Sequence, residues 1–228
     1  MTLNLLEAEG CPPPEETTVT VDIGYATATF EVPADAPSDW KALVVHPHPE
    51  NRRAAFLFPM ERDRWMVTLT GRHEDKPSDN ESEFFAHIRS LPVPTLHNAL
   101  RGAKRCSEIV RFGLKASRWR RFDKEFALPS NLIPIADAIC RLNPVYGQGM
   151  SIAAQQACVL RNALASAASI GSLEHVSGEF IKGAQGTIEA PWATAVVPDF
   201  LDERTQGDRP PDLDKTLKFS AALFKKAS

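Results

Sequence analysis

Residues 135–157, IADAICRLNPVYGQGMSIAAQQA, contain the signals that decide the fold of the second half of this chain. An apolar run leads to Asp137, a turn-forming segment extends from Asn143 to Gly149, and an Ala-rich segment follows. Proline fixes φ and glycine adopts conformations that other residues avoid, so the middle segment predicts a turn. We therefore expect a short buried strand over residues 131–136, a turn, and a helix from about Gln148 to Ala168.

The predicted arrangement places polar groups where a ligand could bind. A strand that ends at Asp137 brings a carboxylate to the carboxyl edge of a sheet, where α/β proteins bind ligands. An ionised carboxylate only accepts hydrogen bonds, so a sugar or polyol hydroxyl is a suitable partner. The start of the following helix has free N–H groups and a partial positive charge, which suit an anion or an electron-rich ring oxygen. Periodicity alone is also compatible with a plain strand-turn-helix segment that binds nothing.

The flanking sequence predicts the other elements. Alternating β-branched and aromatic residues indicate strands over residues 17–32, 41–46, 54–58, 65–70, 107–114 and 117–122. A change to helical period predicts a helix capped by Ser78 or Asp79, and further helices over residues 2–9, 95–102, 172–188 and 212–226. This order predicts an α+β fold with a mixed, largely antiparallel sheet of roughly five to seven strands flanked by helices.

The composition of the chain argues against several classes of protein: those that bind nucleic acid, span a membrane, are secreted or bind a metal ion. The net charge of −3 and the absence of a basic tail argue against a nucleic-acid partner. No apolar run approaches the roughly 18 residues of a membrane span, and the N-terminus lacks the basic and apolar regions of a secretory signal. The four cysteines form no C-x-x-C pair, which favours free thiols and a cytoplasmic location. His46 and His48 have no third ligand at metal-binding spacing, so we expect no metal site.

The stretch at 135–157 resembles the second flavin-contact motif of the FAD-dependent aromatic hydroxylase-type monooxygenases, the class of para-hydroxybenzoate hydroxylase. That motif has Asp-Ala, then Asn-Pro, two further residues and Gly-Gln-Gly-Met, and then an Ala-rich helix. The matching residues here are Asp137-Ala138 and Asn143 to Met150, with Ala136 where the family usually has Gly. The resemblance implies that Asp137 contacts the ribityl or ribose hydroxyls of FAD. It also implies that the isoalloxazine ring is lined by Pro144, Gly147, Gln148, Gly149 and Met150.

The resemblance extends over nearly the whole chain, through residues 10–27, 62–92, 190–200 and 205–213. It implies a substrate-side sheet domain with two short helices at residues 1–130. It further implies a partial FAD-binding segment with C-terminal helices at residues 131–228. The family's dinucleotide-binding half begins with a G-x-G-x-x-G turn, and no such pattern occurs in these 228 residues. We therefore expect the C-terminal part of such a flavoprotein, which by itself binds FAD weakly or not at all.

Three functional hypotheses follow. The first is a portion of an FAD-dependent oxidoreductase or monooxygenase that acts with a separate N-terminal FAD-binding polypeptide on a small apolar or aromatic substrate. In that case the flavin supplies the redox chemistry, and no catalytic acid or base is assigned in this chain. The second is a non-catalytic binder of a small ligand, and the third is a truncated reading frame without an independent role. Flavin binding distinguishes the first two.

Overall fold

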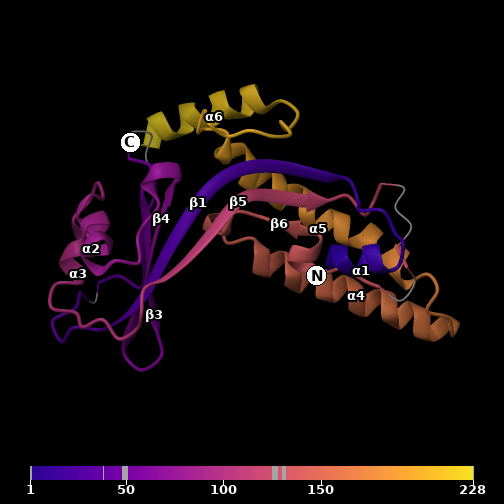
Figure 1. Ribbon diagram of the computed structural model, residues 1–228, viewed down its shortest axis with the longest axis horizontal. Helices are drawn as coiled ribbons and strands as arrows, with labels where there is room; N and C mark the ends of the chain where they lie inside the picture. Colours follow the sequence, from indigo (N-terminus) through magenta and orange to yellow (C-terminus); the bar gives the residue numbers. More distant parts are fainter. Residues whose placement is uncertain (1, 38, 48–50, 125–127, 130–131, 228) are drawn as a thin grey trace. The chain divides into compact units, whose positions relative to one another are not determined.

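The computed structural model describes residues 2–37, 39–47, 51–124, 128–129 and 132–227 (Figure 1). Its strands are β1 (Glu16–Glu31), β2 (Leu43–Val45), β3 (Ala54–Met60), β4 (Arg64–Arg72), β5 (Val110–Arg120) and β6 (Cys140–Arg141). Its α-helices are α1 (Thr2–Ala8), α2 (Glu81–Arg89), α3 (Thr95–Ala99), α4 (Gly149–Ile170), α5 (Val176–Asp199) and α6 (Leu213–Ala227). Three short 3₁₀ helices are η1 (His73–Asp75), η2 (Ala136–Ala138) and η3 (Pro144–Tyr146).

The strands form one sheet in the order β2-β3-β4-β1-β5-β6. The pairs β2–β3, β3–β4, β1–β4 and β5–β6 are antiparallel. Together with the flanking helices, this sheet confirms the predicted α+β class with a largely antiparallel sheet.

Packing divides the chain into two compact units. The first unit contains residues 1–21 and 116–228, and the second contains residues 22–115. The predicted division into a substrate-side domain at residues 1–130 and a flavin-binding segment at residues 131–228 stays a prediction. That division is defined by the ligands that each part would bind, whereas the two compact units are defined by packing.

In the second unit, alternation along the strands separates two faces of the sheet. Ala26, Ala28 and Phe30 of β1 point to one face, where Phe30 stacks against Phe84 of α2 at 6.4 Å between ring centroids. The Asn80 side chain caps α2 by accepting a hydrogen bond from the Glu83 N–H at 3.2 Å. The cap therefore lies one or two residues later than the predicted Ser78 or Asp79.

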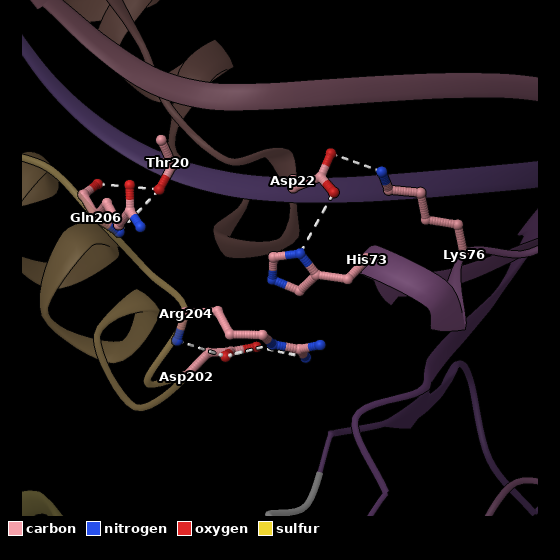
Figure 2. A network of polar contacts seen from close by, with 7 residues as sticks. All are labelled: Thr20, Asp22, His73, Lys76, Asp202, Arg204 and Gln206. Carbon is pink, nitrogen blue, oxygen red and sulfur yellow. Dashed lines mark hydrogen bonds and ion pairs between the residues drawn. The ribbon is translucent and has the colours of Figure 1, made fainter.

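A polar cluster fixes η1 against β1 in the same unit. The Asp22 carboxylate lies between the Lys76 ammonium, at 2.6 Å, and Nδ1 of His73, at 3.3 Å (Figure 2). The hydrogen bond from Lys76 is the largest cause of a lowered pKa at Asp22. Gly24 and Gly71 are register partners beneath this segment, and a Cβ on Gly71 would lie 1.9 Å from the Asp75 carbonyl oxygen. Only glycine at position 71 permits so close an approach.

In the first unit, α4 and α5 lie side by side (Figure 1). A Cβ on Gly183 of α5 would lie 2.6 Å from Cγ1 of Val159 on α4, so this glycine permits close packing of the two helices. Their inner faces join one apolar core that includes Ile152, Phe180 and Ile188. Trp119 and Trp192 meet in this core with their ring centroids 5.6 Å apart.

The loop before α6 is hydrogen-bonded to the first residues of β1. Thr20 donates from its backbone N–H to the Gln206 carbonyl at 2.7 Å, and its hydroxyl also contacts Gln206 (Figure 2). Close by in the sequence, the Arg204 guanidinium pairs with the Asp202 carboxylate at 3.1 Å. These contacts anchor the segment that links α5 to α6.

Two sequence predictions of secondary structure are wrong. The two strands predicted over residues 107–114 and 117–122 are replaced by one strand, β5, which covers Val110–Arg120. The strand predicted over residues 131–136 is absent from 132–136, while residue 131 lies outside the described part. Pro134 has no N–H for a ladder, and the left-handed turn at Ala136, with φ 55°, diverts the chain.

The helix α5 continues to Asp199, eleven residues beyond its predicted end, despite Pro191 and Pro198. Burial of Trp192, Ala195 and Val196 in the core offsets the hydrogen bonds that the prolines lose. Within the described residues, no helix is both long and apolar enough to cross a membrane.

Candidate functional site

The structure places Asp137 in a 3₁₀ turn rather than at the end of a strand, which corrects the sequence prediction. Its side chain is exposed. The turn η2 packs directly against α4, and Asp137 thus belongs to a turn that contacts the helix following it in the motif.

The turn at Asp137 depends on an unusual backbone conformation at the preceding residue. Ala136 has φ 55°, in the left-handed region, which costs a residue with a Cβ roughly 1–2 kcal/mol. Its N–H donates to Oε1 of Gln156 on α4 at 2.7 Å. Gln156 is fully buried, and its Nε2 reaches the Thr187 hydroxyl of α5 at 3.4 Å. One buried amide thus joins the turn to both long helices.

The Asn-Pro turn is held by a second buried polar group. The Asn143 side chain is fully buried; its Nδ2 donates to Oδ1 of Asp199 at 3.2 Å, and its Oδ1 accepts from the Val145 N–H at 3.3 Å. The Tyr146 hydroxyl donates to the same Asp199 oxygen at 2.9 Å. Since Asp199 is also buried, this carboxylate fixes both ends of η3 against the end of α5.

The Gly-Gln-Gly segment leaves open space at the start of α4. Gly147 has φ 66°, and no heavy atom lies within 4 Å of the position that a Cβ would occupy at either Gly147 or Gly149. Met150 is 85% exposed, and Pro144 is exposed as well. Gln148 precedes the helix without capping it by its side chain. The first backbone N–H groups of a 22-residue helix are therefore not covered by a side-chain cap.

All six residues predicted to contact FAD lie in the first unit, on η2, η3 or the start of α4. Five are exposed and Gln148 is half-buried. A carboxylate that accepts hydrogen bonds, two glycines with open space where a Cβ would lie, and a helix start fit a ligand with a polyol chain and an electron-rich ring. The residues present thus suit the ribityl and isoalloxazine parts of a flavin.

Cys140 is not a reactive group of this site. Burial, with a smaller contribution from the Asp137 charge, raises the pKa of its thiol to about 12. A thiol of that pKa is not a nucleophile near neutral pH.

A second surface of functional interest lies in the other unit, on the face of the sheet opposite α2 and α3. Tyr25 and Phe112 approach to 6.0 Å between ring centroids, and Phe112 is 48% exposed. The hydroxyls of Thr27 and Thr68 are 2.8 Å apart. Thr27, Thr68 and Phe56 are half-buried, and Tyr25 is buried beside Phe112. We call this surface of aromatic rings and hydroxyls the open sheet face.

Sequence reasoning missed the residues that hold the motif in place. Gln156 is one of two adjacent glutamines in an Ala-rich helix, and only the phase of the helix distinguishes it from the exposed Gln155. Asp199 follows a proline and offered no local signal. His48 of the considered metal pair lies outside the described residues, and the described part contains no cluster of three metal-ligating side chains.

Comparisons with known proteins relate this fold to flavoenzymes. No protein-family model matches the chain. The Mycobacterium tuberculosis protein Rv3254 is 31% identical over 151 residues, which is 66% of this chain and 32% of that protein. The solved flavin-dependent brominase Bmp2 has a TM-score of 0.60 at 15% identity, covering 94% of this chain and 54% of its own.

Two further solved structures have a fold similar to that of this chain. The myxobacterial chondrochloren halogenase CndH has a TM-score of 0.59 at 16% identity, over 80% of this chain and 43% of its own. The probable FAD-dependent monooxygenase PqsL from Pseudomonas aeruginosa has a TM-score of 0.53 at 18% identity, over 76% of this chain and 48% of its own. This chain spans about a third of Rv3254 and about half of these structures. Its fold is that found in part of flavin-dependent halogenases and monooxygenases.

Proposed function

We propose that this chain supplies the ribityl and isoalloxazine side of an FAD site in a monooxygenase-like oxidoreductase. The observation that carries the proposal is the exposed group formed by Asp137, Gly147, Gly149 and the start of α4, held by buried polar contacts. The fold shared with flavin-dependent enzymes and the match to the family motif support it independently.

The roles of the site residues follow from their chemistry. The Asp137 carboxylate accepts hydrogen bonds from ribityl or ribose hydroxyls. Gly147 and Gly149 let a flat ring approach the backbone, since no side chain intervenes. The N–H groups at the start of α4, preceded by Gln148, stabilise negative charge on a carbonyl edge of the ring. Pro144 and Met150 are exposed and offer apolar contact to the ring. FAD, when bound, would supply the redox chemistry.

The open sheet face is the proposed surface for a small apolar or aromatic substrate. Phe56 and Phe112 offer aromatic contacts, Tyr25 supports Phe112 from beneath the surface, and the Thr27 and Thr68 hydroxyls can fix orientation. Rings with a few placed hydroxyls are the usual lining of small-molecule sites.

A dinucleotide-binding portion that these 228 residues do not include would bind the ADP half of FAD. The exposed side of α4 supports such a partner: Arg161 is the one charged residue in this 22-residue helix, while Met150, Leu164 and Ile170 are exposed. Arg161 is itself exposed, so this part of the helix surface carries a single charge beside exposed apolar side chains, a composition that suits burial against another polypeptide.

Flavin titration tests the proposal. Because the chain offers only the riboflavin side, we expect FMN and FAD to bind weakly and with affinities equal within about threefold, a difference below 1 kcal/mol. Replacing Asp137 by Ala should weaken both at least about tenfold, the effect of losing a charged hydrogen bond. Glu203→Ala removes an exposed carboxylate from the same unit and should leave binding unchanged.

Two results of the flavin titration would contradict parts of this proposal. Equal flavin affinities of the wild-type and Asp137→Ala proteins would refute the role of Asp137. Absence of any flavin binding would favour the alternative of a small-ligand binder without redox function, for which the open sheet face would then be the site.

A further inference from the structure

We infer that Gln156 is the positioning residue of the proposed flavin site: its buried amide holds the left-handed turn at Ala136 and thereby sets Asp137 relative to the start of α4. This inference rests on the proposed function, because Asp137 and the helix start are the two parts of that site. Gln156 does not touch the open space at the motif itself and acts through the backbone of the turn.

The geometry gives Gln156 a specific task. Ala136 has φ 55°, and its N–H donates to Oε1 of Gln156 at 2.7 Å. A partly buried N–H without an acceptor is costly, so this hydrogen bond holds the peptide group between Ile135 and Ala136 against the helix, at the point where the left-handed turn begins. The next residue is Asp137, and its carboxylate therefore follows the orientation of this peptide group.

The other end of Gln156 is also fixed. Its Nε2 approaches the Thr187 hydroxyl at 3.4 Å, and that hydroxyl donates to the Ala184 carbonyl at 2.7 Å. A fully buried amide with partners at both ends has little rotamer freedom. Since Gln156 belongs to the helix whose first residues are Gly149 and Met150, the turn and the helix start are joined by one rigid side chain.

The adjacent Gln155 provides a matched control, since it has the same side chain on the same helix but is exposed. We would compare the wild-type chain with the variants Gln155→Met, Gln156→Met and Gln156→Glu. Two quantities are measured: hydrogen exchange of the Ala136 amide by NMR, and the dissociation constant of FMN by fluorescence titration. Near-ultraviolet circular dichroism verifies that each variant is folded.

We expect Gln156→Met to speed exchange of the Ala136 amide and to weaken FMN binding, each by about tenfold, the loss of one buried hydrogen bond. Gln155→Met should change neither quantity. Gln156→Glu retains the acceptor for Ala136 and, when protonated in the buried site, a donor for Thr187, so it should restore both quantities to near wild-type values. A merely structural role would not produce this rescue of FMN affinity.

The two measurements separate the ways in which the reasoning can fail. Unchanged exchange of the Ala136 amide in Gln156→Met would refute the inference, whatever the flavin result. Faster exchange with unchanged FMN affinity would refute the positioning role while the proposed function stands. Absence of FMN binding in all four proteins would refute the proposed function, and the exchange rates would still decide whether Gln156 holds the turn.

Discussion

His87 should make the stability of this protein depend on pH. It lies on α2, is 6% exposed, and its Nε2 has no hydrogen-bond partner in the described structure. Burial, followed by the positive charge of Arg53, lowers the pKa of His87 from 6.5 to about 4, although Asp75 and a hydrogen bond with the Thr70 backbone act in the opposite direction. The imidazole is therefore neutral in the folded protein throughout the neutral range.

The direction of this pH dependence follows from the difference in proton binding at His87 between the folded and the unfolded chain. Below pH 6.5 the unfolded chain takes up a proton at His87 that the folded chain does not accept until about pH 4. Stability is thus fully present above pH 6.5 and is lost as the pH falls toward 4. The lowered pKa corresponds to about 3 kcal/mol in total, of which about 2 kcal/mol is lost between pH 7 and pH 5.

Urea unfolding of the wild-type and His87→Gln proteins at pH 7 and pH 5 measures this effect. Glutamine stays neutral and keeps an N–H donor for the Thr70 carbonyl. The wild type should therefore lose about 2 kcal/mol more than His87→Gln on acidification. The variant His97→Gln, on the neighbouring helix α3, should behave like the wild type. If the wild type and His87→Gln lose the same stability between the two pH values, the assignment of a buried neutral histidine is wrong.

Three further predictions test other parts of the structure. Ala136→Gly should raise the free energy of unfolding by about 0.5–1 kcal/mol in urea titration. Glycine relieves the strain of the left-handed conformation, and the greater backbone entropy of glycine in the unfolded chain offsets part of this stabilisation. A loss of stability would contradict the left-handed φ of Ala136. In the native protein, a disulfide reagent at pH 8 should modify the exposed Cys106 and Cys158 but not Cys140 until urea is added; modification of Cys140 at the rate of Cys106 would refute its burial. The chain should bind a hydrophobic dye, and Leu164→Glu on the exposed side of α4 should reduce that binding, whereas equal dye binding would place the apolar surface elsewhere.

The sequence by itself determined the elements whose signals are local. Strands such as β1 and β4 follow from the period-2 alternation of Val67, Leu69 and their neighbours, and α4 follows from an Ala-rich run after a glycine turn. The class of fold follows from the order of these elements, and the six predicted site residues follow from the resemblance of residues 135–157 to a known flavin-contact motif. Each of these signals is contained within about twenty consecutive residues, so no distant contact is needed to recognise it.

Only the tertiary structure decided what depends on contacts between distant residues. Proline would end an isolated helix, yet α5 continues through Pro191 because the core buries Trp192 beyond it. The turn at Asp137 replaces the predicted strand because Gln156, twenty residues away, accepts the N–H of Ala136. The Asn143–Asp199 contact likewise joins residues 56 positions apart. Local propensities differ by about 1 kcal/mol or less, so a single buried hydrogen bond or a large buried ring is enough to override them.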